Sequence, residues 1–169
     1  MDNQIELVAY DDFWLKVYAK ESATLEKLLR SNFIGCEHIG STAIPSVTAR
    51  PTLDILCVVH TLDGIKAFKD EFKKLGFILN EKVDTKDEFS FERFGPDGIR
   101  PLTNVRIYKK GDIRINDCLD FRDYLNAEDV VAREYQNTKA SLVANYPKNS
   151  VVYEEAKTKF FEAVLSKIS

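Results

Sequence analysis

A turn that directly follows the strand predicted over 33–39 carries side chains that could bind phosphate. Gly40, Ser41 and Thr42 follow one another directly after a short apolar segment. Glycine lets the backbone turn closely, and the N–H groups and hydroxyls of such a turn can hold phosphate oxygens. The residue types and their order therefore predict an anion site at this turn.

Asp54 lies in the next apolar segment, between Leu53 and Ile55. An ionised carboxylate among apolar neighbours is costly unless a cation or hydrogen-bond donors surround it. Magnesium is commonly held by one or two carboxylates together with substrate phosphates. A carboxylate on a strand beside a hydroxyl-lined turn thus favours a site for a metal-bound nucleotide, with Asp54 as the Mg²⁺ ligand.

A simpler interpretation of the same residues stays open. Gly40 and Ser41 can form an ordinary strand-ending turn, and Asp54 can accept hydrogen bonds from a neighbouring loop or pair with Arg50. Short Gly-Ser motifs have a high rate of false matches. Spacing alone does not choose between a phosphate site and a structural turn.

Four cations are the candidate phosphate contacts outside the turn: Arg50, Arg122, Lys139 and Lys157. Each of the two lysines follows a tyrosine by four residues, so each pair shares one face of a predicted helix. Either lysine can extend to solvent or project its ammonium into a cleft. Arg122 opens a helical segment beside Asp123, where local pairing or helix capping explains it as well as ligand binding does.

Two further arrangements are weaker. Cys36 with His38, and Cys57 with His60, lie on neighbouring predicted strands, but their spacings match no common zinc motif. Buried cysteines more often pack as small apolar side chains. No Ser-His-Asp or Cys-His arrangement is evident, so a hydrolase of that kind is not predicted.

The elements that position these residues follow from apolar periodicity. Helical spacing recurs over 11–30, 63–75, 117–125, 127–145 and 150–168. Strands are predicted over 33–39, 51–60, 77–79, 88–94 and 102–108. The order is a helix, then a mixed β-sheet with one embedded helix, then a C-terminal helical pack, which indicates an α+β fold.

Length and charge limit the class of protein. At 169 residues the chain has the size of one domain, so 1–169 is expected to fold as a single domain. The net charge of -3 gives no general attraction for a nucleic-acid backbone, so any phosphate site must be local. Three cysteines without disulfide spacing, no signal-peptide pattern over 1–10 and no long apolar segment predict a cytoplasmic protein without a membrane span.

The run 38–45, followed by Asp54 in the next strand, resembles the signature of the GrpB family of the nucleotidyltransferase superfamily. The run 121–125 resembles the second signature of that family. Further matching residues on the C-terminal helices are Glu134, Tyr135, Lys139, Tyr153, Ala156, Lys157 and Phe160. The resemblance covers most of the chain and implies a nucleotidyltransferase-like core, with Gly40 and Ser41 on the triphosphate and Asp54 on the metal.

Three features depart from the pattern of that superfamily. A second carboxylate usually follows the first by two positions, where this chain has Leu56. The next strand often carries two histidines, where this chain has Asn104 and Arg106, and Ser46 replaces a common glycine. Two interpretations stay open: another acid, such as Glu37, Glu92 or Asp117, compensates in a two-metal transfer, or catalysis is weak or absent.

These features support two functions and leave a third open. The first is a metal-dependent nucleotidyltransferase that moves a nucleoside monophosphate from a triphosphate to an acceptor, with Lys139, Lys157 and Arg122 neutralising the departing charge. The second, favoured by Leu56, is a non-catalytic module that binds a nucleotide or a coenzyme A-like phosphate compound. The third is a protein-interaction scaffold with a vestigial cleft.

Overall fold

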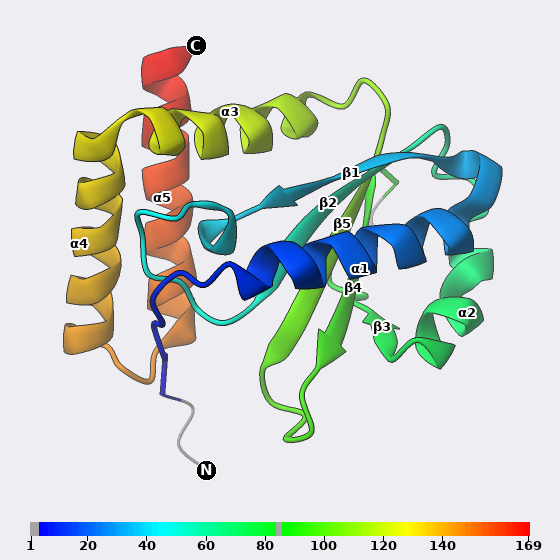
Figure 1. Cartoon of the computed structure of the whole chain (residues 1–169), viewed down its shortest axis with the longest axis horizontal. Helices are drawn as coiled ribbons and strands as arrows, with labels where there is room; N and C mark the ends of the chain where they lie inside the picture. The colour runs from blue at the N-terminus through cyan, green and yellow to red at the C-terminus, as the bar shows by residue number, and fades with distance from the viewer. Residues whose placement is uncertain (1–3, 84–85) are drawn as a thin grey trace.

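The computed structural model describes residues 4–83 and 86–169. Its α-helices are α1 (Phe13–Leu29), α2 (Lys69–Lys74), α3 (Ile113–Ala127), α4 (Asp129–Asn145) and α5 (Ser150–Ile168). Its strands are β1 (Phe33–Ile39), β2 (Leu53–Val59), β3 (Phe77–Leu79), β4 (Glu88–Phe94) and β5 (Pro101–Lys109). Figure 1 shows α1 and α2 beside the sheet, with α3, α4 and α5 gathered at its other side.

The strands form one mixed sheet in the order β1-β2-β5-β4-β3. β2 and β5 run parallel, and the other neighbouring pairs are antiparallel. A parallel pair needs a crossover connection, which is provided here by the segment that contains α2, β3 and β4. β2 therefore has neighbours on both edges, in agreement with its nearly continuous apolar sequence.

The face of the sheet under α1 and α2 holds the main apolar core. Leu53 and Ile55 of β2 point to this face, where they join Leu25 of α1. Phe72 of α2 stacks on Phe91 of β4, with the ring centroids 3.8 Å apart. Strand side chains alternate between the two faces of a sheet. Asp54, which lies between Leu53 and Ile55, therefore faces the opposite side.

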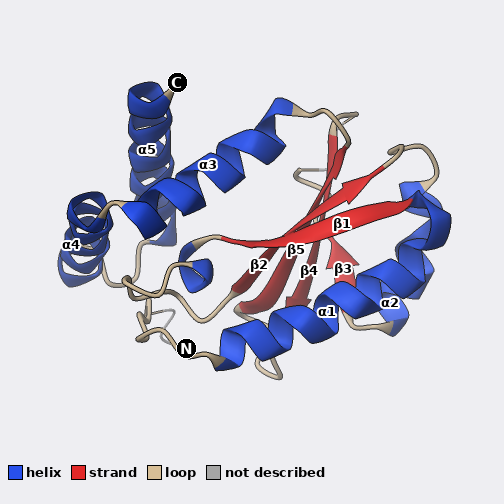
Figure 2. Ribbon diagram, turned by 45° about the horizontal axis from the view of Figure 1, so that its top comes forward, coloured by secondary structure: helices blue, strands red, loops and turns tan. Residues whose placement is uncertain are grey.

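The opposite face of the sheet meets the C-terminal helices. The start of α3 covers Leu56 and Tyr108, and α3 then runs past the sheet to α4 and α5, as Figure 2 shows. Ile44 and Val47, from the connection between β1 and β2, are buried in the core of this helical pack. The connection that carries the predicted phosphate turn is therefore held between the sheet and the three helices.

The predicted α+β fold with a mixed sheet, an N-terminal helix and a C-terminal helical pack is confirmed. The helix predicted over 63–75 is shorter, because Ile65–Phe68 form a 3-10 turn and α2 begins at Lys69. Gly64 stands before this turn with a left-handed φ of 79°. α3 begins before the predicted residue 117, since the side chain of Asp112 accepts a hydrogen bond from the N–H of Arg114 and caps the helix.

The segment between the strands predicted over 77–79 and 88–94 includes 84–85, which lie outside the described residues. Over the described ranges, no helix is both long and apolar enough to cross a membrane.

Candidate functional site

Asp54 stands in a row of side chains that crosses the sheet. Strand register places Ile39, Asp54, Asn104 and Glu92 side by side on β1, β2, β5 and β4. The amide Nδ2 of Asn104 donates to Oδ1 of Asp54 at 3.2 Å. The hydroxyl of Ser90 in turn donates to Oδ1 of Asn104 at 3.1 Å, which fixes the orientation of the amide. One oxygen of Asp54 is thus held by the sheet.

The turn after β1 closes over the other oxygen of Asp54. Gly40 has a φ of 73° and a ψ of -172°, a region that is essentially restricted to glycine. A Cβ atom at this position would lie 2.5 Å from Oδ2 of Asp54. Glycine is therefore required both by the backbone conformation and by the close approach of the carboxylate. Ser41 begins the single 3-10 turn that follows.

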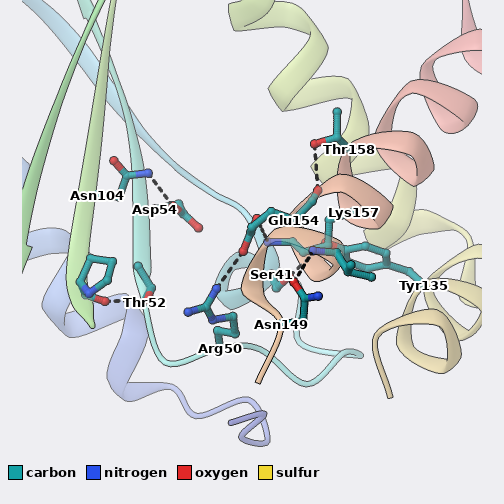
Figure 3. Close-up of polar contacts among 12 residues, drawn as sticks. Ser41, Arg50, Thr52, Asp54, Asn104, Tyr135, Asn149, Glu154, Lys157 and Thr158 are labelled. Atoms are coloured by element: carbon teal, nitrogen blue, oxygen red, sulfur yellow. Dashed lines mark hydrogen bonds and ion pairs between the residues drawn. The ribbon is translucent and has the colours of Figure 1, made fainter. Parts of the chain in front are cut away.

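A cleft opens between this row and the helical pack, and it contains two adjoining cavities of about 290 and 250 Å³. The two cavities share a wall that consists of Ser41, Asp54, Arg106, Glu154 and Lys157. The larger of the two is mainly apolar, and its other lining residues are Ile39, Gly40, Cys118, Phe121, Tyr135, Thr158 and Phe161. The smaller is mainly polar, and its other lining residues are Arg50, Thr52, Glu92, Pro101 and Asn104. Figure 3 shows Asp54 on the sheet side and Glu154 and Lys157 on the α5 side of this cleft.

Arg106 contributes a cation to the cleft from β5 of the sheet. It lies two residues after Asn104 on β5, on the same face, and pairs in register with Leu56. Within the described residues its guanidinium forms no hydrogen bond or ion pair. Burial raises the pKa of Asp54, while the charges of Arg106 and Lys157 and the amide of Asn104 act in the opposite direction. Arg106 thus supplies positive charge beside Asp54 and keeps its own donors available.

Lys157 enters the cleft from α5. Its Nζ donates to Oε2 of Glu154 at 3.3 Å and lies 5.4 Å from the centroid of the Tyr153 ring. Burial acts to lower the pKa of Lys157, but the surrounding acidic groups, Tyr135 and Glu154 first, raise it above its ordinary value. Arg50 donates to the second oxygen of Glu154 at 2.9 Å. Lys157 and Arg50 are therefore held as cations on one carboxylate.

Lys139 lies directly behind Ser41 and has no solvent exposure. Its Nζ is 3.3 Å from the Oγ of Ser41, also contacts the carbonyl oxygen of Thr48, and lies 4.3 Å from the centroid of the Tyr135 ring. The Tyr135 hydroxyl is likewise 3.3 Å from the Oγ of Ser41. Burial and the nearby charge of Lys157 lower the pKa of Lys139 to about 7. Ser41 is consequently bordered by two polar groups of α4.

Two predicted phosphate contacts lie away from the cleft. The Thr42 hydroxyl is buried at 2.9 Å from Nε2 of His38, so it stabilises the turn from inside. The guanidinium of Arg122 donates to Glu37, to the carbonyl oxygen of His38 and to Asp123. Neither Thr42 nor Arg122 lines either cavity. The structure brings together Gly40, Ser41, Asp54, Arg50 and Lys157, while Lys139 reaches the cleft through Ser41.

The acids that could complement Asp54 are separated. Glu37 is paired with Arg122, and Asp117 lines neither cavity. Glu92 faces the polar cavity but stands two strands from Asp54, with Asn104 between them. Among the described residues, no three His, Cys, Asp or Glu side chains lie close enough together to hold a metal ion. Cys36, His38, Cys57 and His60 therefore do not form a zinc site of that size. Asp54 and the acids named above do not fit a two-ion centre, because such a centre needs a second acid beside Asp54 and the described residues place none there.

Arg106, Tyr135 and Glu154 belong to the cleft but are not among the residues predicted to bind a ligand. Arg106 stands at a position where related proteins often have histidine, and its alternation with Asn104 on one strand places both on the same face as Asp54. Tyr135 shares a helix face with Lys139 by its spacing. Glu154 could have been found by the same rule, since it lies three residues before Lys157.

Known proteins resemble the chain in both sequence and fold. The family model described as GrpB protein matches residues 4–167. The Glutamate-rich protein GrpB of Alkalihalophilus pseudofirmus is 29% identical over 170 residues, covering 98% of this chain and 96% of that protein. The protein YqkA of Bacillus subtilis is 27% identical over 159 residues, covering 94% of this chain but 46% of YqkA.

Solved structures extend the likeness to the fold. The crystal structure of the conserved protein GrpB from Enterococcus faecalis superposes with a TM-score of 0.85 at 25% identity, covering 96% of this chain and 99% of that one. The Cid1 poly(U) polymerase, described as bound to MgATP, gives a TM-score of 0.53 at 14% identity and covers 78% of this chain and 45% of that one. The second likeness concerns the fold alone and identifies it as nucleotidyltransferase-like. With a family match over nearly the whole length and a related fold throughout, the chain belongs to the GrpB family.

Proposed function

We propose that the cleft binds a nucleotide or another phosphate-bearing small molecule. The observation that carries this proposal is the guanidinium of Arg106, which has no hydrogen-bond partner among the described residues and lies on the wall shared by both cavities. A guanidinium can donate two parallel hydrogen bonds to phosphate, and such charge-assisted bonds are about twice as strong as neutral ones. We therefore propose Arg106 as the primary phosphate contact.

Further donors surround the same position. Lys157 and Ser41 share this wall with Arg106, and Arg50 lines the polar cavity. Lys157 and Arg50 are held by Glu154, whose side chain is 52% exposed, so a phosphate can displace that carboxylate at little cost. The adjoining apolar cavity offers space for the uncharged part of the ligand, such as a nucleobase. Likeness to a fold that binds MgATP in Cid1 supports a nucleotide as the ligand.

Binding does not depend, in this proposal, on a metal ion held by the protein. Asp54 is the carboxylate at the centre of the row, and Leu56 stands where a second metal ligand would be needed. Arg106 and Lys157 both oppose the rise in the pKa of Asp54 and provide the compensation that a metal would provide. Binding of a phosphate-bearing ligand without a protein-held metal is thus the function that the cleft supports best.

Magnesium-dependent nucleotidyl transfer is the second candidate. It is favoured by Oδ2 of Asp54, which lies under the Gly40 turn and accepts no hydrogen bond from the described residues. In this case Mg²⁺ would be bound by Asp54 together with the phosphates of the ligand. Pyrophosphate release from a nucleoside triphosphate separates this candidate from binding alone.

Calorimetric titration of the purified chain with nucleoside triphosphates, nucleoside monophosphates and coenzyme A, each with Mg²⁺ and with EDTA, tests the proposal. We expect at least one of these ligands to bind in EDTA. Arg106→Gln should weaken its binding about 10-fold to 100-fold, since a hydrogen bond to a charged group contributes about 1.5–3 kcal/mol. The matched control is Arg133→Gln, an exposed arginine of α4 that lines neither cavity, and it should bind as the parent does.

Failure of every ligand to bind, or equal affinity in Arg106→Gln and the parent, overturns the phosphate site. Binding that is lost in EDTA and abolished by Asp54→Asn, together with pyrophosphate release, would replace the binding module by the transferase.

A further inference from the structure

Ser41 has the surroundings of an activated nucleophile. Its Oγ lies on the wall shared by the two cavities. Lys139 approaches this oxygen to 3.3 Å from behind, and the Tyr135 hydroxyl approaches it to the same distance from α4. A serine becomes nucleophilic when a base lies within hydrogen-bond reach and a third group orients that base. Here the carbonyl oxygen of Thr48 is the third group, since Nζ of Lys139 also contacts it.

The environment of Lys139 favours the neutral amine over the ammonium. The side chain is fully buried, and no carboxylate forms an ion pair with it among the described residues. The connection that covers it, residues 41–48, contains no ionisable side chain. The titratable groups that face it are Lys157, whose positive charge opposes protonation, and Tyr135 of its own helix. A neutral amine donates one hydrogen to Thr48 and keeps a lone pair for the proton of Ser41.

We propose that Ser41 is a catalytic nucleophile and that Lys139 is its general base, acting on the phosphorus of a phosphate ester or anhydride bound in the cleft. This inference rests on the proposed phosphate site, because that site places the phosphorus beside Ser41. The Oγ–P bond forms while the bond from phosphorus to its leaving oxygen breaks. The proton of Ser41 passes to Nζ of Lys139, and the leaving group departs as an oxyanion, pyrophosphate in the case of a nucleoside triphosphate.

Two features of the cleft assist this step. Arg106 and Lys157 lie on the same wall as Ser41 and neutralise the negative charge that develops on phosphorus and on the leaving oxygen. Tyr135 positions the hydroxyl through its hydrogen bond with Oγ. The product is a phosphoserine diester or monoester at Ser41, a covalent intermediate or a lasting self-modification.

A fluorophosphonate such as diisopropyl fluorophosphate tests the nucleophile without knowledge of the natural ligand. Attack by Ser41 forms the Oγ–P bond, breaks the P–F bond and releases fluoride, and the proton passes to Lys139. Intact-mass and peptide mass spectrometry should find one adduct, at Ser41, with the other serines of the chain as internal references. Its rate should rise with pH and level off above about 7, as Lys139 loses its proton.

The variants distinguish a base from a structural lysine. Ser41→Ala should remove the adduct, and Lys139→Met should slow labelling about 100-fold or more, within the usual range for general-base catalysis. Lys139→Arg retains a charged side chain that cannot accept the proton, so it should also be slow. Lys157→Gln removes a nearby positive charge and should move the midpoint of the pH profile upward. Melting temperatures and circular dichroism identify any variant that fails to fold.

Labelling of Ser41 no faster than that of surface serines, or equal rates in the parent and in folded Lys139→Arg, overturns the inference. The outcome is separable from that for the phosphate site. Labelling of the parent protein by the uncharged probe reports on Ser41 and Lys139, whose Oγ and Nζ are 3.3 Å apart, whereas calorimetry with the phosphate ligands reports on Arg106. Intact ligand binding without labelling removes the nucleophile alone, whereas intact labelling without ligand binding removes the phosphate site alone.

Discussion

Replacing Gly40 by alanine should damage the protein through two separable effects. The φ of 73° and ψ of -172° belong to a region that side chains other than glycine avoid, at a cost of about 1–3 kcal/mol. The new Cβ would also meet Oδ2 of Asp54 at 2.5 Å and its Cβ and Cγ at 3.1 Å. Asp54 is anchored on a central strand, so crowding should add about 1–3 kcal/mol. The expected loss in the free energy of unfolding is therefore about 2–6 kcal/mol.

Urea unfolding, monitored by circular dichroism at constant m value, measures this loss. The matched control is Gly64→Ala, because Gly64 has a φ of 79° but an added Cβ there meets nothing within 4 Å. This control should cost about 1–2 kcal/mol, the usual penalty of a left-handed conformation. A double-mutant cycle with Asp54→Ala isolates the crowding, since Gly40→Ala should cost about 1–3 kcal/mol less in that background.

The result that would refute this reasoning is a Gly40→Ala variant no less stable than Gly64→Ala. Equal penalties for Gly40→Ala with and without Asp54 would show that the turn does not press on the carboxylate. In either case the link between the turn and Asp54, on which the geometry of the cleft depends, would be wrong.

Three further outcomes follow from particular contacts. Burial and Arg122 lower the pKa of His38 from 6.5 to about 4, so the folded state binds fewer protons than the unfolded state between these pH values. The free energy of unfolding should therefore be complete above pH 6.5 and fall by about 3 kcal/mol towards pH 4. Urea unfolding across this pH range measures the change, and His38→Gln should reduce the dependence of the unfolding free energy on pH. Glu21→Ala leaves Arg93 without its buried partner and should cost about 2–4 kcal/mol, whereas the exposed control Glu155→Ala should cost under about 0.5 kcal/mol in the same assay. Arg50→Ala removes an ion pair whose side chains are 26% and 52% exposed, so its unfolding free energy should change by less than about 1 kcal/mol, while calorimetry should detect weaker ligand binding.

Much of the fold could be predicted because the apolar spacing within most segments agrees with the helix or strand that each segment forms. The strands predicted over 33–39, 77–79 and 88–94 are found with the same bounds as β1, β3 and β4, because the apolar residues that define them lie within each segment. The start of α3 was missed because the cap of Asp112 depends on a side-chain contact and not on apolar spacing. The helix predicted over 63–75 begins later than expected, at Lys69, because the left-handed Gly64 is followed by the 3-10 turn Ile65–Phe68.

Part of the candidate site could likewise be predicted from local sequence, and part could not. The likeness of 38–54 to a family signature was enough to name Gly40, Ser41 and Asp54, and the family membership is confirmed. Helical spacing could pair Tyr135 with Lys139, but it could not say which side of the helix meets the turn. Thr42 and Arg122 were reasonable candidates by residue type, and the fold directs them to His38 and Glu37 instead. Their assignment to a ligand stays a prediction.

By itself, the sequence determined the α+β order of elements, the glycine turn and the acid on the next strand, because each is encoded by residues close together in the chain. The tertiary structure alone decided that Lys139 meets Ser41 across a separation of 98 residues. It also decided that Arg106 lies beside Asp54, through the register of two parallel strands. Such contacts arise from burying Ile44 and Val47 in the helical pack and from pairing β2 with β5, and long-range packing leaves no periodic signal along the sequence.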